Sequence, residues 1–297
     1  MHLMRRERIG FQMKRRTIDE HVQWLGGIDW GRRLFDGLIP LPDGTSYNAY
    51  LIEGSEKTVL VDTADPRKEA ELMAQLDGAP VPDYVVIQHV EQDHSGTLPK
   101  VLNRYPDARV LASPKGKDML TALLQMSEER VDTVEDGETL SLGDVTLTFA
   151  HMPWVHWPET MVTYLKESKL LFTCDFFVQD PAKVTEAAKR YYAEIMMPFR
   201  RVIARNLDRL DDFDIDLIAP SHGPIYRNPD YILDAYRSWV SDPPSNTVVL
   251  PYISMHGSTE VMVHHFVEAL VARGVTVQQF ELSVADLGKL AMALVDA

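Results

Sequence analysis

The stretch IQHVEQDHSGTLP, residues 87–99, places two imidazoles and two carboxylates within six positions, directly after an apolar run. The run DYVVIQH predicts a buried strand that ends on His89, and loops at strand ends often carry function. A polar turn followed by a helix with Asp93 or Ser95 as its N-cap fits the same residues. Further ligand-type side chains at other strand ends would favour a metal site. The four side chains are those of His89, Glu91, Asp93 and His94.

Ligand-type side chains do recur where apolar strands give way to turns. His156 follows the run TFAHMPWV, Asp175 ends LLFTC, and His222 lies in DLIAPSHGP. Each alone has an ordinary explanation, because a histidine after a strand is more often a surface residue and an aspartate can cap a turn. Their recurrence favours one rim built by several strands.

The remaining patterns predict an α/β fold in which β structure dominates. NAYLIEG and TVLVDT flank the turn signal GSEK and predict a hairpin, and strands then alternate with helical segments. A long helical stretch is expected from about residue 181 to 210, and the Pro, Ser and Asn cluster in SDPPSN suggests a domain boundary. We therefore expect one domain over residues 17–243 and another over 246–297.

The second region has a different pattern. TVVLPYIS and VTVQQFEL read as strands on either side of the helical segment EVMVHHFVEALVARG, the βαβ opening of a doubly wound sheet. Such a domain typically needs about 100 residues. The expectation from the sequence is thus a cut or remnant domain. His264 and His265 are expected on a solvated helix face.

Composition excludes several classes of function. The 297 residues carry a formal charge of −14, which argues against nucleic acid or an anionic membrane as the main partner. No apolar run approaches the roughly 18 residues of a membrane span. The basic opening, residues 1–16, lacks the apolar core of a signal peptide and is expected to be a disordered or extended N-terminal arm, or an upstream start extension. The single Cys174 fits a reducing compartment, so we expect the cytoplasm.

The ordered set H-x-E-x-D-H, His, Asp and SHGP resembles the metallo-β-lactamase fold, in particular its flavodiiron protein branch. More specific matches are GGIDWGRRLFDGLIPLPDGTSYNAYLIEG, VHWPETMVTYL, FTCDFF and APSHGPIYR, and the tail YISMHGSTEVM resembles the phosphate loop of that family's flavodoxin domain. The resemblance covers nearly the whole chain from about residue 20. It implies an αββα sandwich followed by the opening βαβ of a flavodoxin-like domain.

Transferred to this sequence, the resemblance implies a binuclear iron centre. One iron would take His89, Glu91 and His156, the other would take Asp93, His94 and His222, and Asp175 would bridge them. The histidine at the place of His94 does not always coordinate within the family. His151 is rejected, because the family places its ligand in the HWP triplet. Trp154 and Trp157 are expected to wall the site or to pack in the core.

Glu91 bears on the chemistry, since the hydrolase relatives are usually described with histidine there. A carboxylate is a harder ligand than imidazole, and an N/O ligand set suits iron and oxygen chemistry. Two divalent ions bring four positive charges against three from Glu91, Asp93 and Asp175, which leaves room for one hydroxide. The added negative charge also favours the ferric state and hence redox work.

The resemblance also implies partners. The substrates would be O2, reduced to water, or NO, reduced to N2O, with electrons relayed by FMN from rubredoxin or a flavin or NADH reductase, in a homodimer or tetramer. The FMN phosphate would lie on the loop between strand and helix, although the later flavin loops would fall beyond Ala297, so tight FMN binding is not expected. That loop comprises Ser254, Met255, His256, Gly257, Ser258 and Thr259.

Two other functions stay open on the sequence. A flavin-free diiron protein that binds and senses oxygen would form a stable adduct without consuming it. A binuclear zinc hydrolase would use a metal-bound hydroxide of lowered pKa. Glu91 and the iron-branch motifs count against the hydrolase.

Overall fold

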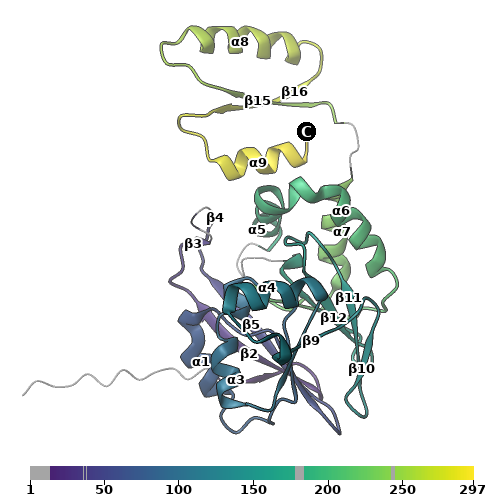
Figure 1. The fold of residues 1–297 in the computed structure, drawn as a ribbon. Coiled ribbons are helices and arrows are strands. Elements are labelled where there is room, and N and C mark those ends of the chain that lie inside the picture. Colours follow the sequence, from purple (N-terminus) through teal and green to yellow (C-terminus); the bar gives the residue numbers. More distant parts are fainter. Residues whose placement is uncertain (1–13, 36, 38, 178–183, 242–244) are drawn as a thin grey trace, which may run out of the picture.

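The computed structural model describes residues 14–35, 37, 39–177, 184–241 and 245–297 (Figure 1). Most of the predicted N-terminal arm, residues 1–13, and part of the predicted boundary, residues 242–244, lie outside this description. None of the described helices is both long and apolar enough to cross a lipid bilayer.

Two sheets form the larger body. The first has seven strands in the order β1-β2-β5-β6-β7-β8-β9, antiparallel from β1 to β6 and parallel from β6 to β9. The predicted hairpin is confirmed, because β5 pairs with β6. The strands are β1 (Arg16–Thr17), β2 (Val22–Asp29), β5 (Thr45–Glu53), β6 (Thr58–Val61), β7 (Tyr84–Val86), β8 (Arg109–Ala112) and β9 (Val131–Thr133).

The second sheet has five strands in the order β10-β11-β12-β13-β14, of which only the pair β13 and β14 is parallel. A short hairpin, in which β3 and β4 have two residues each, is separate from both sheets. The strands are β3 (Leu34–Phe35), β4 (Ile39–Pro40), β10 (Thr139–Ser141), β11 (Thr146–His151), β12 (Met161–Leu165), β13 (Leu170–Cys174) and β14 (Leu217–Pro220).

Helices cover the outer face of each sheet. The helices are α1 (Glu69–Gln75), α2 (Gln92–Ser95), α3 (Leu98–Arg104), α4 (Pro114–Leu124), α5 (Val184–Tyr191), α6 (Arg200–Leu210) and α7 (Pro229–Val240). Three hydrophobic clusters lie between the layers, one under α1, α3 and α4, one between the two sheets, and one under α5, α6 and α7. The predicted αββα sandwich is confirmed (Figure 1).

Local chemistry sets several boundaries. Ser113 caps α4, because its hydroxyl accepts a hydrogen bond from the amide of Gly116 at 3.0 Å, and Pro114 fills the first turn, where no amide partner is needed. The predicted helix over residues 181–210 is not continuous. Its described part, residues 184–210, is α5, a π-helical turn, a 3-10 turn that contains Pro198, and then α6.

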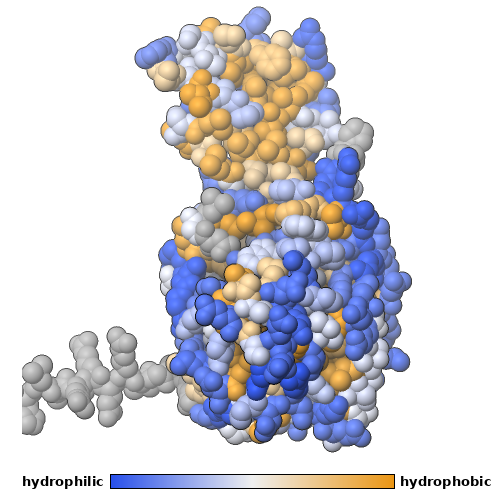
Figure 2. All heavy atoms as spheres, in the orientation of Figure 1, coloured by the Kyte–Doolittle hydropathy of each residue, from blue (hydrophilic) through white to orange (hydrophobic). Residues whose placement is uncertain are grey.

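The C-terminal region forms a separate layer. The strands β15 (Thr247–Tyr252) and β16 (Thr276–Glu281) pair in parallel around α8 (Ser258–Val271), as predicted. A further helix, α9 (Leu287–Val295), was not predicted. It packs toward α5, where Arg190 contacts Asp286 at 2.9 Å. Figure 2 shows hydrophobic residues gathered over this region. Met262 and Phe266 of α8 are among the exposed large hydrophobic side chains.

Candidate metal centre

Four strands of the sandwich deliver the candidate ligands to one edge. His89 and Glu91 follow β7, His156 follows β11, Asp175 follows β13, and His222 follows β14. β7 ends at Val86, three residues before the predicted end at His89. Asp93 and His94 lie on the one-turn helix α2, whose N-cap is Glu91 rather than Asp93 or Ser95.

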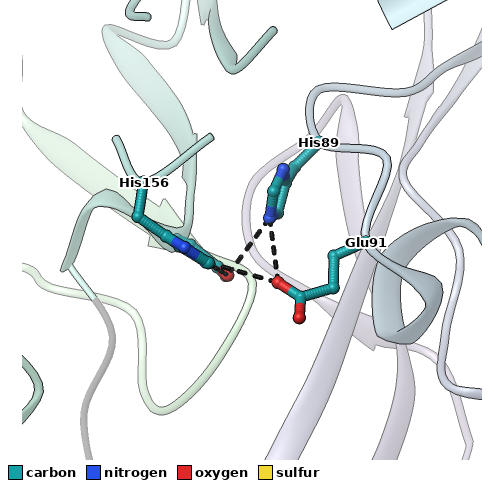
Figure 3. Close-up of side chains that lie close together, drawn as sticks. His89, Glu91 and His156 are labelled. Atoms are coloured by element: carbon teal, nitrogen blue, oxygen red, sulfur yellow. Dashed lines mark hydrogen bonds and ion pairs between the residues drawn. The ribbon is translucent and has the colours of Figure 1, made fainter. Parts of the chain in front are cut away.

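His89, Glu91 and His156 form the first group (Figure 3). The Nε2 atoms of the two histidines lie 3.1 and 3.3 Å from Oε2 of Glu91, and all three side chains point toward one another. Donor atoms bound at about 2.1 Å to one ion lie roughly 3 Å apart, so these separations fit ligands of a single metal. The group with Asp175 added is suited to hold an ion.

Asp93, His94 and His222 form the second group. Nε2 of His222 lies 3.1 Å from Oδ2 of Asp93, and Nε2 of His94 lies 3.3 Å from Oδ1 of the same carboxylate. His222 is held in this orientation because its Nδ1 bonds to the carbonyl of Ser46 at 2.6 Å. The ring of His94 therefore faces the same point as the other two ligands.

Asp175 lies between the two groups. Its Oδ2 is 3.8 Å from Nε2 of His89 and 3.6 Å from Nε2 of His156. Its Oδ1 is 3.2 Å from Nε2 of His94 and 3.4 Å from Nε2 of His222. One carboxylate thus offers one oxygen to each group, which is the geometry of a bridge between two ions.

The electrostatics show how strongly the cluster favours positive charge. Burial by itself lowers the pKa of His89, but hydrogen bonds to Glu159 and Glu91 raise it to about 10. Burial would raise the pKa of Glu91, yet the close imidazoles of His156 and His89 lower it to about 2. The pKa of Asp175 is likewise held low against burial, by His94 and His222. Bound cations would experience the same field.

Buried polar atoms without a hydrogen-bond partner converge at this point. Unpaired buried polar atoms are uncommon and usually have a functional explanation. A metal pair would satisfy them, so the residues fit such a group. Among the described residues these atoms are both carboxylate oxygens of Asp93 and of Asp175, both ring nitrogens of His94, and Nε2 of His156 and of His222.

Two carboxylates around the site were not predicted. Glu159 is buried and accepts hydrogen bonds from Nδ1 of His89 at 2.8 Å and from the amide of Val90 at 3.0 Å. Asp62 accepts from the amide and side chain of Gln88, the residue before His89. Glu159 fixes the direction of the His89 ring, as second carboxylates commonly do for metal-bound histidines, whereas Asp62 holds the residue before it. For Glu159, the available sequence signal was an acidic residue three positions after the predicted ligand His156.

Of Trp154, Trp157 and His151, only Trp157 contacts a ligand of the candidate site. Trp157 lies edge-on against His89, with ring centroids 5.0 Å apart, whereas Trp154 stacks on Phe199. His151 bonds through Nε2 to the carbonyl of Val134 and is not a member of either ligand group. A pocket of about 310 Å³ opens beside the cluster, with Glu91, Asp93 and Trp157 in its wall.

The predicted flavin loop lies in the C-terminal layer, between β15 and α8. Gly257, with φ of +80°, is the residue before α8, and Ser254 accepts a hydrogen bond from the amide of Glu260 at 3.2 Å. Met255 is 84% exposed, and His264 and His265 are exposed on α8, as predicted.

Known proteins are similar to this chain both in sequence and in architecture. The family model described as ODP family beta lactamase matches residues 45–223. A nitric oxide reductase of Moorella thermoacetica is 38% identical over 301 residues, which cover 95% of this chain and 75% of that protein. The chain belongs to the flavodiiron protein family.

Solved structures of flavodiiron proteins and their relatives agree with this assignment. Rubredoxin oxygen:oxidoreductase from Desulfovibrio gigas matches with a TM-score of 0.88 at 31% identity, over 95% of this chain and 75% of that one. The flavodiiron protein from Giardia intestinalis matches with a TM-score of 0.84 at 26% identity, over 94% and 72%. The αββα sandwich with a following α/β region is thus the flavodiiron arrangement.

Proposed function

We propose that this flavodiiron protein is an oxidoreductase that reduces O2 to water, NO to N2O, or both. The observation that carries the proposal is the position of Asp175, whose two oxygens face two separate ligand groups. The names of its relatives support the activity, because they include a nitric oxide reductase and a rubredoxin oxygen:oxidoreductase.

In this proposal the first ion takes His89, Glu91 and His156, and the second takes Asp93, His94 and His222, with Asp175 shared. The orientation of His94 toward Asp93 and Asp175 supports its inclusion. The ligand set contains nitrogen and oxygen donors, which suit iron. When bound, an iron pair supplies redox electrons and open coordination positions.

The protein's own residues hold the donors in place. Glu159 and the carbonyl of Ser46 fix the rings of His89 and His222, so each presents Nε2 inward. Trp157 shields His89 on one side. The carboxylates of Glu91 and Asp93, together with the shared Asp175, offset most of the charge of two divalent ions, which lowers the cost of holding four positive charges at a mostly buried site.

The electron count requires an outside donor. Conversion of two NO to N2O and one water takes two electrons and two protons, whereas reduction of O2 to two waters takes four of each. We propose that FMN relays these electrons and that residues 254–259 bind its phosphate, since backbone amides at a helix start favour anions. A rubredoxin or a flavin reductase is the proposed donor, a homodimer the proposed assembly, and the cytoplasm the proposed location.

One preparation tests the proposal. The purified chain is analysed for metals and flavin, and consumption of O2 and NO is then followed with reduced flavin as electron donor. We expect two irons per chain and steady consumption of at least one gas. Two zinc ions per chain with ester or lactam hydrolysis would contradict the proposal, and so would iron that binds O2 without consuming it.

A further inference from the structure

Tyr47 has a buried hydroxyl without a hydrogen-bond partner among the described residues. The side chain, near the start of β5, is only 1% exposed, and its oxygen is shielded from solvent. An unpaired buried hydroxyl costs stability, and a phenylalanine would fill nearly the same space without that cost. By contrast Tyr50, three residues along the same strand, donates to the carbonyl of Pro220 at 2.6 Å.

The position of Tyr47 connects it to the metal centre. Its ring meets that of His222 edge-on, with centroids 5.5 Å apart. It also lines the pocket of about 310 Å³ whose wall includes Glu91 and Asp93, one member of each ligand group.

We propose that the Tyr47 hydroxyl donates a hydrogen bond to a small ligand held in this pocket at the metal centre. The ligand class is a two- or three-atom species with an oxygen or nitrogen acceptor, as O2, NO and azide are. The inference rests on the proposed function, because it requires metal ions that hold such a ligand. It assigns a role in ligand binding to the hydroxyl of Tyr47, because the ring would pack equally well without it.

The substitution Tyr47→Phe tests this, with azide as the probe for the oxidised, iron-loaded protein. Loss of one hydrogen bond is expected to weaken azide binding about fivefold, measured by absorbance titration. The N–O stretching frequency of the NO-treated, reduced protein is expected to shift as well. The unfolding temperature is expected to stay equal or to rise, because the lost hydroxyl has no partner in the part of the chain that the structure describes.

Tyr236→Phe is the matched control. Tyr236 also has a buried hydroxyl without a partner in the described chain, but it packs against Phe177 and Tyr192 and does not line the pocket. This variant is expected to keep the stability, azide affinity and N–O frequency of the natural protein.

Two results would overturn the inference. One is a Tyr47→Phe variant with unchanged azide affinity and N–O frequency, and the other is a clear drop in its unfolding temperature, which would assign the hydroxyl to the fold. In both cases the proposed function still stands if the natural protein consumes O2 or NO. If the natural protein holds no iron and binds neither probe, the proposed function fails, and this inference fails with it.

Discussion

At the residue scale, one hydrogen bond decides how His89 presents itself. Glu159 accepts from Nδ1 of His89, so Nε2 of that ring is left to face Glu91 and Asp175. An imidazole whose far nitrogen bonds to a carboxylate is also a more basic ligand. We therefore expect the metal affinity of the first group to depend on Glu159, which is not among the proposed ligands.

We expect Glu159→Ala to weaken iron binding by roughly 10- to 100-fold, because the ring of His89 loses its orientation and its charged partner. Glu159→Gln keeps one acceptor and is expected to lose less. Competition with a coloured chelator measures the affinity. The control is Glu138→Gln, which changes an exposed carboxylate that accepts from the amide of Glu135. Equal affinity in the Glu159→Ala and natural proteins would contradict the assigned role.

At the element scale, a single glycine allows β2 and β5 to approach each other beside the site. Gly26 has φ of +109°, and a Cβ atom placed there would lie 1.9 Å from the carbonyl oxygen of Tyr47. The obstructing atom belongs to the backbone, so it cannot move aside without displacing β5. That strand carries Ser46, whose carbonyl holds His222.

We expect Gly26→Ala to lower the free energy of unfolding by about 3 kcal/mol, from strain and overpacking together. The matched control is Gly137→Ala, where φ is +81° but nothing lies within 4 Å of the added atom. At Gly137 only the cost of placing a Cβ-bearing residue at positive φ applies, about 1 kcal/mol. Urea denaturation of the two variants measures the difference. Equal losses would show that the contact with Tyr47 is relieved without cost.

At the scale of the whole molecule, the clustered imidazoles and carboxylates link stability to pH. In the metal-free protein the pKa of His89 is raised from 6.5 to about 10, so its contribution is complete below pH 6.5 and is lost as the pH rises to about 10. The pKa of Glu91 is lowered from 4.5 to about 2, so its contribution is present above pH 4.5 and is lost toward pH 2.

The unfolding temperature of the metal-free protein is therefore expected to be highest between about pH 4.5 and 6.5 and to fall from pH 6.5 to 10. Metal ions replace the protons on the histidines, so the iron-loaded protein is expected to decline less over the same range. Calorimetry of both forms across this range provides the measurement. A metal-free protein whose unfolding temperature is constant or rises above pH 6.5 would refute the linkage.

Much of this architecture follows from local patterns in the chain. Alternating strands and helices, the β5–β6 hairpin and the placing of His156, Asp175 and His222 after strands are read from runs of a few residues. The α9 helix was missed, since its short segment follows a turn with no strong start signal beyond Asp286. The role of Glu159 was missed because its partner His89 is 70 residues away in the sequence.

By itself the sequence determined which residue types stand at the ends of which strands, and hence that donors for a metal site exist. Only the tertiary structure decided their grouping. Whether Asp175 faces one ligand group or two depends on how the two sheets pack face to face. That packing sums many weak contacts between residues far apart in the chain, and no local pattern records it. The same packing leaves the hydroxyl of Tyr47, whose ring contacts His222, without a partner among the described residues.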